Sequence, residues 1–380
     1  WHQYLGGAEI RPTGMLTLRI DLAAPVADLL DVLCQAFVAA PACLDALDAG
    51  DLSAAIGSGP YRLDDVSAGS ITASARRDHF AGTPAHPAIA WIALPDPQDR
   101  LVHLAEECAE IATRLPTDAL PPEGAALVRY ADPTAIIYLF NQATGPLVDA
   151  RVRRALNMAI DRTTLIDDVL GGAARPLHGF VSDAHFGAAT GTDDPHDPGE
   201  ARRLLSEAGH GTGLTLTVDC PTRLPDEAEA LTAALAGQLA PLGVTLDIRR
   251  HADREAYAHM VRRKEIGDMC VFDSSPMSTF RVLHEKLDSR VSGAWWQGHR
   301  NPALERHLDR ARRIADPDER EAVYRDIYRM VQADPPWLFL YTATRVLGLR
   351  GHAPGFDMPA DGVLDVARLP RLVPAPARGA

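Results

Sequence analysis

One segment near the middle of the chain combines two hydrophobic periodicities. An apolar run from Tyr138 ends at Asn141, and a short turn that contains glycine and proline follows it. Beyond the turn, Val152, Leu156 and Ile160 recur at the four-residue spacing of one helical face. The pattern predicts a buried strand followed by an amphipathic helix that packs through this apolar stripe.

A second segment, which begins at Leu214, alternates strand spacing with helix spacing. LTLTVD alternates as a strand, Leu231, Leu235 and Leu239 share one helical face, and VTLDIRR from Val244 alternates again. Two strands joined by a helix close as a right-handed parallel crossover. The segment therefore predicts a β-α-β unit and places part of the chain in the α/β class.

Four further helices are predicted from the residues that start them. Asp96, Asp197, Asn301 and Asp316 each precede a proline. Their side chains can accept hydrogen bonds from the free N–H groups of a first helical turn, and proline fits the first helical position because its missing N–H is not needed there. The first of these helices is expected to end near Pro116.

The five cysteines give no sign of a metal site. Cys34, Cys43, Cys108, Cys220 and Cys270 form no C-x-x-C pair, and no histidine lies at a zinc-ligand spacing. Cys108 falls on the apolar stripe of the helix that is predicted to begin after Asp96, where a small buried thiol fits. Cys34 and Cys43 could form a disulfide in an oxidising compartment, and the odd total leaves at least one free thiol.

The chain is acidic and contains almost no lysine. Its formal net charge is −13, which argues against binding to nucleic acid and against a polybasic membrane patch. It contains 36 arginines and two lysines, Lys264 and Lys286. We attribute this ratio to the base composition of the genome and not to an arginine-dependent site.

The order of the motifs resembles that of a known family. The motifs are the segment from Tyr138 to Asp168, GSGPYRL from Gly57, ALPDPQDRLVHL from Ala93, DPGEARRLLSEAG from Asp197 and NPALERHLDRARRIADPDER from Asn301. Their sequence and order are similar to those of the extracellular solute-binding proteins of the peptide, nickel and oligosaccharide class (family 5). These proteins are the receptors that deliver solutes to ABC importers.

The resemblance, which covers about residues 12–360, implies a two-lobe α/β periplasmic-binding-protein-like fold with an accessory subdomain. A chain of 380 residues also exceeds what one core usually holds. We expect residues 1–56 to be a remnant of the accessory subdomain, residues 57–141 and 342–380 to form an incomplete first lobe, and residues 142–341 to form the second lobe.

The resemblance also implies a location and partners. No signal peptide can be read at the start of the chain, and family members carry an upstream part that this sequence lacks. We therefore expect an N-terminally truncated protein of the periplasm or the extracellular space, with a possible membrane anchor in the missing part. The expected partners are a peptide or small-molecule solute and the ABC permease subunits, with no nucleic acid and no cofactor, and the expected state is a monomer.

The candidate ligand site follows the strand that is predicted to begin at Met269. Asp273 should emerge at the carboxyl end of this strand, where open α/β sheets present side chains to a ligand. In the peptide receptors that the chain resembles, a carboxylate in this stretch accepts the α-ammonium group of the ligand, although Asp273 could instead cap a helix that starts near Pro276. The candidate ligand-binding residues are Asp273, Ser274, Ser275, Arg281, Trp295, Trp296, Tyr138 and Asn141.

Each of the other candidates has a structural alternative. The serine hydroxyls can donate or accept hydrogen bonds, and Arg281 offers a planar fork for a carboxylate. Trp295 and Trp296 could stack on a ligand or pack on their own lobe. Tyr138 and Asn141 could lie at the hinge or in the core. The cluster of Arg151, Arg153 and Arg154 is expected to be a solvated helix face.

No catalytic machinery is evident in the sequence. A serine hydrolase of the G-x-S-x-G type is excluded because the motif does not occur, and the histidines lack the spacing of a helical metal site. The resemblance therefore predicts a receptor that closes on a peptide-like or small polar solute and releases it unchanged. A solute-sensing module of a regulator, and a hydrolase on the same scaffold, are the alternatives.

Overall fold

The computed structural model divides the chain into two compact units. It describes residues 2–189, 196–222, 225–274, 277–351 and 353–373. Unit 1 comprises Trp1–Leu33 and Pro133–Ala343, and unit 2 comprises Cys34–Asp132 and Thr344–Ala380. Two long strands, β7 (Ala125–Phe140) and β12 (Trp337–Arg350), contribute residues to both units. The sequence predicted lobe boundaries near residues 141 and 341, and the unit boundaries follow Asp132 and Ala343.

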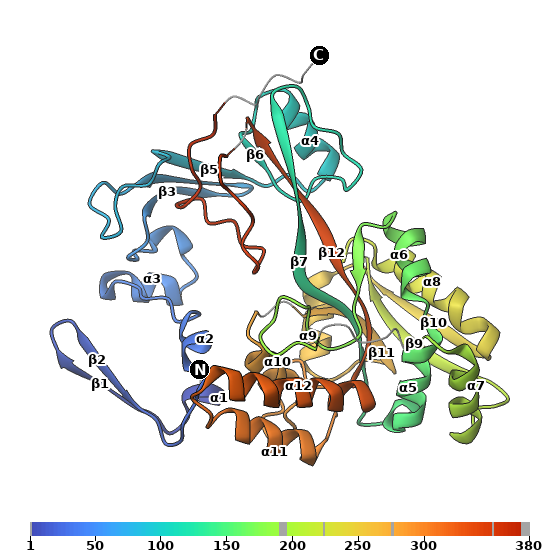
Figure 1. Cartoon of the computed structure of the whole chain (residues 1–380). Coiled ribbons are helices and arrows are strands. Elements are labelled where there is room, and N and C mark those ends of the chain that lie inside the picture. The colour runs from blue at the N-terminus through green and yellow to red at the C-terminus, as the bar shows by residue number, and fades with distance from the viewer. Residues whose placement is uncertain (1, 190–195, 223–224, 275–276, 352, 374–380) are drawn as a thin grey trace. The chain divides into compact units, whose positions relative to one another are not determined.

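Unit 1 is an α/β unit with helices on both faces of its main sheet (Figure 1). Its α-helices are α1 (His2–Leu5), α2 (Leu29–Leu33), α5 (Ala150–Ala159), α6 (Arg162–Leu170), α7 (Pro198–Glu207), α8 (Ala228–Leu239), α9 (Arg254–Arg262), α10 (Thr279–Lys286), α11 (Pro302–Ala311) and α12 (Pro317–Ala333). Its remaining strands are β1 (Glu9–Gly14), β2 (Thr17–Asp21), β8 (Ala174–Pro176), β9 (Leu214–Pro221), β10 (Val244–His251) and β11 (Met269–Ser274). Short 3-10 helices cover Pro146–Val148 and Ala240–Leu242.

The main sheet has the order β10-β9-β11-β7-β12, and β8 pairs with β12. Strands β9 and β10 are parallel from the pair Leu214 and Val244 to the pair Pro221 and His251. The predicted strands and their joining helix are thus confirmed. Strand β11 is parallel to β9 and antiparallel to β7, so that β9, β10 and β11 all end at the same edge of the sheet.

Successive residues of the central strands enter two different cores, one on each face of the sheet. In β11, Met269 and Val271 join the core that α5, α6, α7 and α8 cover, whereas Cys270 joins the core under α9, α10, α11 and α12. In β7, Tyr138 joins the core under α5, α6, α7 and α8, and Ile137 joins the core under α9, α10, α11 and α12. This alternation follows from the two-residue period of a strand, and it decides which face each candidate side chain occupies.

The helix starts that the sequence predicted are confirmed. The side chains of Asp96, Asp197, Asn301 and Asp316 each accept a hydrogen bond from a backbone N–H of the first helical turn, and a proline occupies the first turn in every case. The carboxylate oxygen Oδ1 of Asp197, for example, lies 2.9 Å from the backbone nitrogen of Glu200. A hydrogen bond between a capping side chain and a backbone N–H two or three residues later is thus enough to set where these helices begin.

The predicted extent of the helix after Asp96 is wrong. Helix α4 (Pro97–Ala105) ends well before Pro116 because Glu107 takes a left-handed conformation (φ 64°) that stops it. The N–H groups of Cys108 and Ala109 then both donate to the carbonyl of His103. Cys108 is consequently exposed, and the apolar stripe of the helix ends at the buried Leu104.

Unit 2 contains the remaining elements. They are α3 (Leu44–Asp48), α4, β3 (Tyr61–Ser67), β4 (Ser70–Ala75), β5 (Ala88–Ile92), β6 (Ile111–Ala112) and short 3-10 helices at Pro41–Cys43 and Leu52–Ala54. Strands β3, β4 and β5 form an antiparallel sheet, and β6 pairs with the part of β12 that lies in this unit. Leu104, Leu115 and Val346 contribute to a small core between α4 and these strands.

The first 33 residues belong to unit 1, although residues 1–56 were expected to form one remnant. Asp28 is buried, accepts a hydrogen bond of 2.8 Å from the hydroxyl of Tyr324, and lies 3.6 Å from the guanidinium of Arg320. Val32, which is 1% exposed, enters the core under α12. These contacts are made by residues far apart in the sequence, so local patterns did not reveal them. The helix α2 that follows Asp28 covers only Leu29–Leu33.

All five cysteines are free thiols, and the possible bridge between Cys34 and Cys43 is absent. Cys34 and Cys108 are exposed, whereas Cys43, Cys220 and Cys270 are buried, and burial raises the pKa of Cys220 and of Cys270. Because the thiolate is the reactive form, a maleimide should label two thiols in the native chain and five after unfolding. Labelling of only three thiols in the unfolded, unreduced chain would instead show a disulfide.

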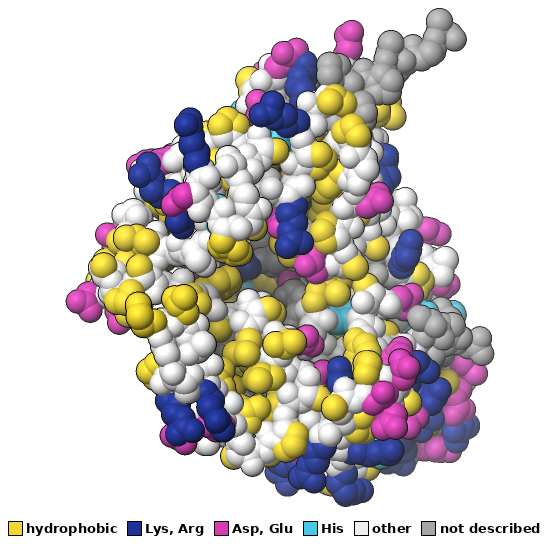
Figure 2. Space-filling view, turned by 60° about the vertical axis from the view of Figure 1, so that its left-hand side comes forward, with side chains coloured by type: hydrophobic (Ala, Val, Ile, Leu, Met, Phe, Trp, Pro, Cys, Tyr) yellow, Lys and Arg dark blue, Asp and Glu magenta, His cyan; other side chains and the backbone are white. Residues whose placement is uncertain are grey.

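The surface is charged with both signs. Figure 2 shows Lys and Arg side chains gathered along the lower edge of the face that it presents, next to Asp and Glu side chains. Among the described residues, no helix combines the length and the apolar composition needed to cross a bilayer.

Candidate functional site

The candidate site begins at the carboxyl end of β11. Asp273 is the penultimate residue of this strand and pairs with Ile136 of β7, while Ser274 pairs with Ala135. The parallel strands β9 and β10 end at the same edge. The expectation that Asp273 lies at a carboxyl-terminal strand edge is therefore confirmed.

The carboxylate of Asp273 is half-buried and unpaired. It makes no hydrogen bond or ion pair with any residue that the structure describes, and its electrostatic neighbour is the ammonium group of Lys286. The alternative role of Asp273 as a helix cap is wrong, because α10 begins only at Thr279 and its cap is Ser278, whose hydroxyl accepts the N–H of Arg281 at 3.3 Å. A half-buried carboxylate without a partner can accept hydrogen bonds from a cationic group.

Ser274 adds a second unsatisfied group. Its side chain is 2% exposed, and its hydroxyl has no hydrogen-bond partner among the described residues. Leaving a buried hydroxyl unsatisfied costs about 1–3 kcal/mol. Ser275, the third member of the predicted polar run, lies outside the described residues.

The two tryptophans make contacts within unit 1. The ring of Trp295 lies 4.7 Å from the ring of Phe272 at 42°, and the guanidinium of Arg262 lies 4.9 Å from its centre. The indole N–H of Trp296 donates to the carbonyl of His299 at 2.6 Å. Both rings are half-buried. Phe272 and Asp273 are neighbours on one strand, so the stack places Trp295 next to the end of β11, on the face opposite to the side chain of Asp273.

Arg281 already has protein partners. Its Nε donates to the carboxylate of Glu285 at 3.0 Å and lies 3.5 Å from the hydroxyl of Tyr4. Tyr4 also donates to Glu285, and burial together with this carboxylate raises the pKa of Tyr4 to about 12. The fork that the sequence suggested for a ligand carboxylate is thus directed at the protein itself.

Tyr138 and Asn141 lie away from the end of β11. Tyr138 is fully buried, and its hydroxyl is 2.7 Å from the hydroxyl of Thr232, so it is a core residue. Asn141 follows the opposite end of β7, where its amide donates to the carbonyls of Ile266 and Gly267. The structure therefore does not bring these two residues together with Asp273.

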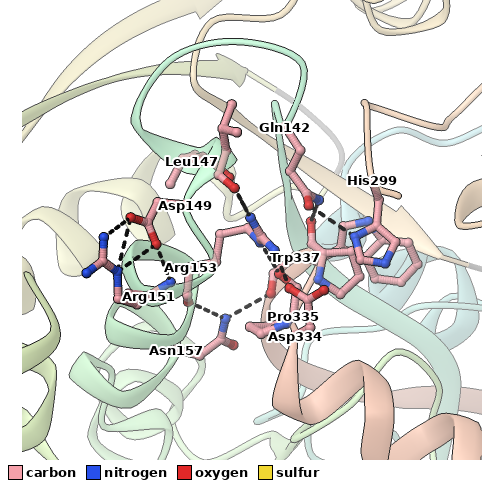
Figure 3. A network of polar contacts seen from close by, with 12 residues as sticks. Gln142, Leu147, Asp149, Arg151, Arg153, Asn157, His299, Asp334, Pro335 and Trp337 are labelled. Carbon is pink, nitrogen blue, oxygen red and sulfur yellow. Dashed lines mark hydrogen bonds and ion pairs between the residues drawn. The ribbon is translucent and has the colours of Figure 1, made fainter. Parts of the chain in front are cut away.

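Figure 3 shows a polar network that the sequence did not reveal. Arg153 was expected on a solvated helix face, but it is 4% exposed and donates to the carbonyls of Leu147, Val148 and Pro335 and to the carboxylate of Asp334. The guanidinium thereby joins α5 to the segment that enters β12. Only the folded chain identifies this contact, because the residues are about 180 positions apart.

A histidine belongs to the same network (Figure 3). Burial lowers the pKa of His299 to about 4, so the ring is neutral at neutral pH. Its Nδ1 lies 3.0 Å from the amide oxygen of Gln142, and the amide nitrogen of Gln142 donates to the carbonyl of Pro336 at 3.2 Å. These hydrogen bonds join Gln142, the second residue after β7, to His299 and to the residue that precedes β12.

Sequence reasoning also missed the buried lysine beside Asp273. Lys286 is 3% exposed, and its ammonium group donates to the backbone carbonyl of Asp273 at 3.2 Å. Burial lowers its pKa to about 8. The signal available in the sequence was the rarity of lysine, which we attributed to genome composition alone.

Unit 2 contains a groove of about 850 Å³ of its own. It is lined by β5, by the segment around β6, and by residues near the C-terminus that include Leu364 and Leu372. None of the predicted ligand-binding residues lines it. Among the described residues, no group of three or more His, Cys, Asp or Glu side chains could hold a metal ion.

Known proteins resemble this chain in sequence. Residues 2–280 match the sequence profile of the bacterial extracellular solute-binding proteins, family 5 Middle. The glutathione-binding protein GsiB of Pectobacterium atrosepticum is 25% identical over 323 residues, which cover 80% of this chain and 62% of GsiB. The probable di/tripeptide-binding protein 5 of Pseudomonas aeruginosa is 24% identical, over 83% of this chain and 62% of the relative. The chain thus spans about three fifths of the length of these relatives.

Solved structures share the fold. The periplasmic binding protein DppA of Helicobacter pylori, in complex with the peptide STSA, has a TM-score of 0.80 at 19% identity, over 97% of this chain and 75% of DppA. The putative peptide-binding protein AppA of Clostridium difficile has a TM-score of 0.81 at 15% identity, over 97% of this chain and 80% of AppA. The predicted fold class is confirmed, and because the family profile matches most of the sequence, the chain belongs to the bacterial extracellular solute-binding proteins, family 5.

Proposed function

We propose that this chain is the solute-binding part of a receptor for an ABC importer. It binds a peptide-like or small polar solute with a free ammonium group and passes it unchanged to a permease in the membrane. Membership of the family supports the class of function. The names of the relatives, which bind glutathione or di- and tripeptides, favour a short peptide. The family also supports a place outside the cytoplasmic membrane.

The observation that carries the proposal is the carboxylate of Asp273 at the carboxyl end of β11, which makes no hydrogen bond or ion pair with a described residue. An ammonium group is a strong partner for such a carboxylate, since a hydrogen bond to a charged group contributes about 1.5–3 kcal/mol. A peptide N-terminus supplies three donors, and the two oxygens of the carboxylate can accept them.

Solute binding is expected to shift the receptor between conformations. A solute shifts such an equilibrium only as far as its contacts differ between the two states. We expect binding to stabilise a form of the receptor that a permease distinguishes from the empty one. A micromolar dissociation constant corresponds to about −8 kcal/mol, of which the contact with Asp273 would supply a substantial part.

The test compares trialanine with N-acetyl-trialanine by isothermal titration calorimetry. The two peptides differ only in the ammonium group that Asp273 is proposed to accept. We expect trialanine to bind in the micromolar range and the acetylated peptide to bind at least tenfold more weakly. Equal affinities would refute the ammonium contact, and an absence of binding by both would refute short peptides as solutes.

A further inference from the structure

Both lysines of the chain donate hydrogen bonds to backbone carbonyls. Lys286 donates to Asp273 at 3.2 Å, and Lys264 donates to Gly293 and to Ala294 at 2.6 Å each. The acceptors belong to two short segments, the end of β11 and the loop that carries Trp295. Each ammonium group is therefore directed at one of the two segments around the candidate site.

The two segments also contact each other. The rings of Phe272 and Trp295 stack at 4.7 Å, and a cation flanks each ring, with Lys286 5.7 Å from the centre of Phe272 and Arg262 4.9 Å from the centre of Trp295. The loop also lies directly on α10: a Cβ atom on Gly293 would lie 2.2 Å from the carbonyl oxygen of Glu285. The hydrogen bonds of the two lysines thus add to a close contact between the end of β11, the loop that carries Trp295 and α10.

Lys264 adopts an unfavourable backbone conformation at its position. It follows the end of α9 with φ of 63°, a left-handed conformation that glycine adopts more readily than lysine. A residue kept in such a conformation suggests that its side chain has a role there. Its two hydrogen bonds supply that role, because they bind the loop of residues 293–296, the tryptophan loop.

Lys286 occupies a place that suits an apolar side chain better. Its ammonium group lies 5.7 Å from the centre of the Phe272 ring and 5.9 Å from the centre of the Trp337 ring. The charged groups around it are Asp273 of β11 and Glu285 and Arg281 of α10, and burial disfavours its charge, as its pKa of about 8 shows. Burying an ammonium group costs free energy that an apolar side chain at this place would not cost. Stability of the fold therefore does not explain the presence of this lysine.

The composition of the chain also distinguishes these two positions. Arginine serves at 36 basic positions and lysine at only these two. A guanidinium is flat and wide, whereas an ammonium group is compact and can point three donors at carbonyls. A compact ammonium group can therefore reach the carbonyl of Asp273 beside the rings of Phe272 and Trp337.

We propose that Lys264 and Lys286 are positioning residues that fix the end of β11 and the tryptophan loop, and thereby set the place of the Asp273 carboxylate. The effect on a solute rests on the proposed function. The fixing of the two segments does not, so the two can be tested separately. Neither lysine needs to touch the solute.

The first test measures hydrogen exchange in Lys264→Met and Lys286→Met by mass spectrometry, with the melting temperature as a second readout. We expect amides in residues 269–274 and 293–296 to exchange at least tenfold faster, while the rest of unit 1 and the melting temperature remain as in the wild type. Arg202→Met is the matched control, because Arg202 is an exposed cation of the same unit that also donates to a carbonyl. Unchanged exchange in both segments, or an equal rise throughout unit 1, would overturn the proposal.

The conservative variant Lys286→Arg tests the need for lysine. Because a guanidinium is wider than an ammonium group and Lys286 is buried, we expect a lower melting temperature than for Lys286→Met and no recovery of slow exchange at residues 269–274. Wild-type exchange and melting in Lys286→Arg would show that any cation suffices, and would overturn the assignment to an ammonium group.

The second test measures the affinity of Lys286→Met for trialanine. We expect the dissociation constant to rise at least fivefold while the melting temperature is unchanged or higher, a combination that general destabilisation would not produce. Faster exchange with unchanged affinity would refute the link to solute binding. Failure of the wild type to bind trialanine would refute the proposed solute, and the exchange data would still decide whether the lysines fix the two segments.

Discussion

Arg162→Met should lower the free energy of unfolding of unit 1 by about 3 kcal/mol or more, because it leaves several buried carbonyls without a donor. Arg162 has no exposed surface. Its guanidinium donates to the carbonyls of Asn157, Ile160 and Phe339 and to the side chain of Asn157. One side chain therefore joins the end of α5 to β12, and methionine fills a similar space without any donor. Differential scanning calorimetry measures the effect.

Arg154→Met is the matched control for this stability prediction. Arg154 belongs to α5 but is exposed, and exposed substitutions away from special features usually change stability by less than about 0.5 kcal/mol. Arg162→Lys keeps the charge but not the fork, so we expect an intermediate loss. If Arg162→Met melted at the wild-type temperature, the hydrogen bonds of Arg162 would not stabilise the fold.

Asp273→Ala should weaken the binding of trialanine at least tenfold and leave the melting temperature nearly unchanged. Tenfold corresponds to about 1.4 kcal/mol, which is at the lower end of what a hydrogen bond to a charged group contributes. The melting temperature should hold because the carboxylate makes no hydrogen bond or ion pair with a described residue, and because the carbonyl that Lys286 binds belongs to the backbone. Isothermal titration calorimetry and thermal unfolding test the two halves of the prediction.

Asp247→Ala is the control for the affinity prediction. Asp247 is an exposed carboxylate in the middle of β10, a strand of the same sheet, where it pairs with Thr217 away from the carboxyl-terminal edge. Removing it changes the net charge by the same amount as Asp273→Ala, so a general electrostatic effect would appear in both variants. A loss of melting temperature in Asp273→Ala without any loss of affinity would show that Asp273 has a structural role and no role in binding.

The elements of this fold could be predicted where their signals are local. The caps at Asp197 and Asp316 and the strand at Leu214 depend on a few consecutive residues, and they fold as expected. The helix after Asp96 was extended too far because Glu107 takes a conformation that glycine usually supplies. The contacts of the N-terminal residues could not be predicted, because Asp28 finds its partner Tyr324 almost 300 positions away.

The candidate site could be predicted only in part, for the same physical reason. The position of Asp273 follows from the end of a strand, which the sequence marks. Tyr4, which contacts Arg281, and Gly267, whose carbonyl Asn141 binds, lie far from these residues along the chain, and only folding brings them close. Lys286 was overlooked because its neighbours on α10 suggest an ordinary helix end, whereas its burial depends on the packing of Trp337 from a distant strand.

The scarcity of lysine has a practical consequence for following the motions of this protein. A protease that cuts only after lysine has two targets in the whole chain, and both lie in unit 1. In the folded molecule the ammonium groups at both targets are held by carbonyls, so cutting requires a local opening first. The rate of such digestion would therefore report how often unit 1 opens locally. Unit 2 contains no lysine and would not contribute to the measured rate.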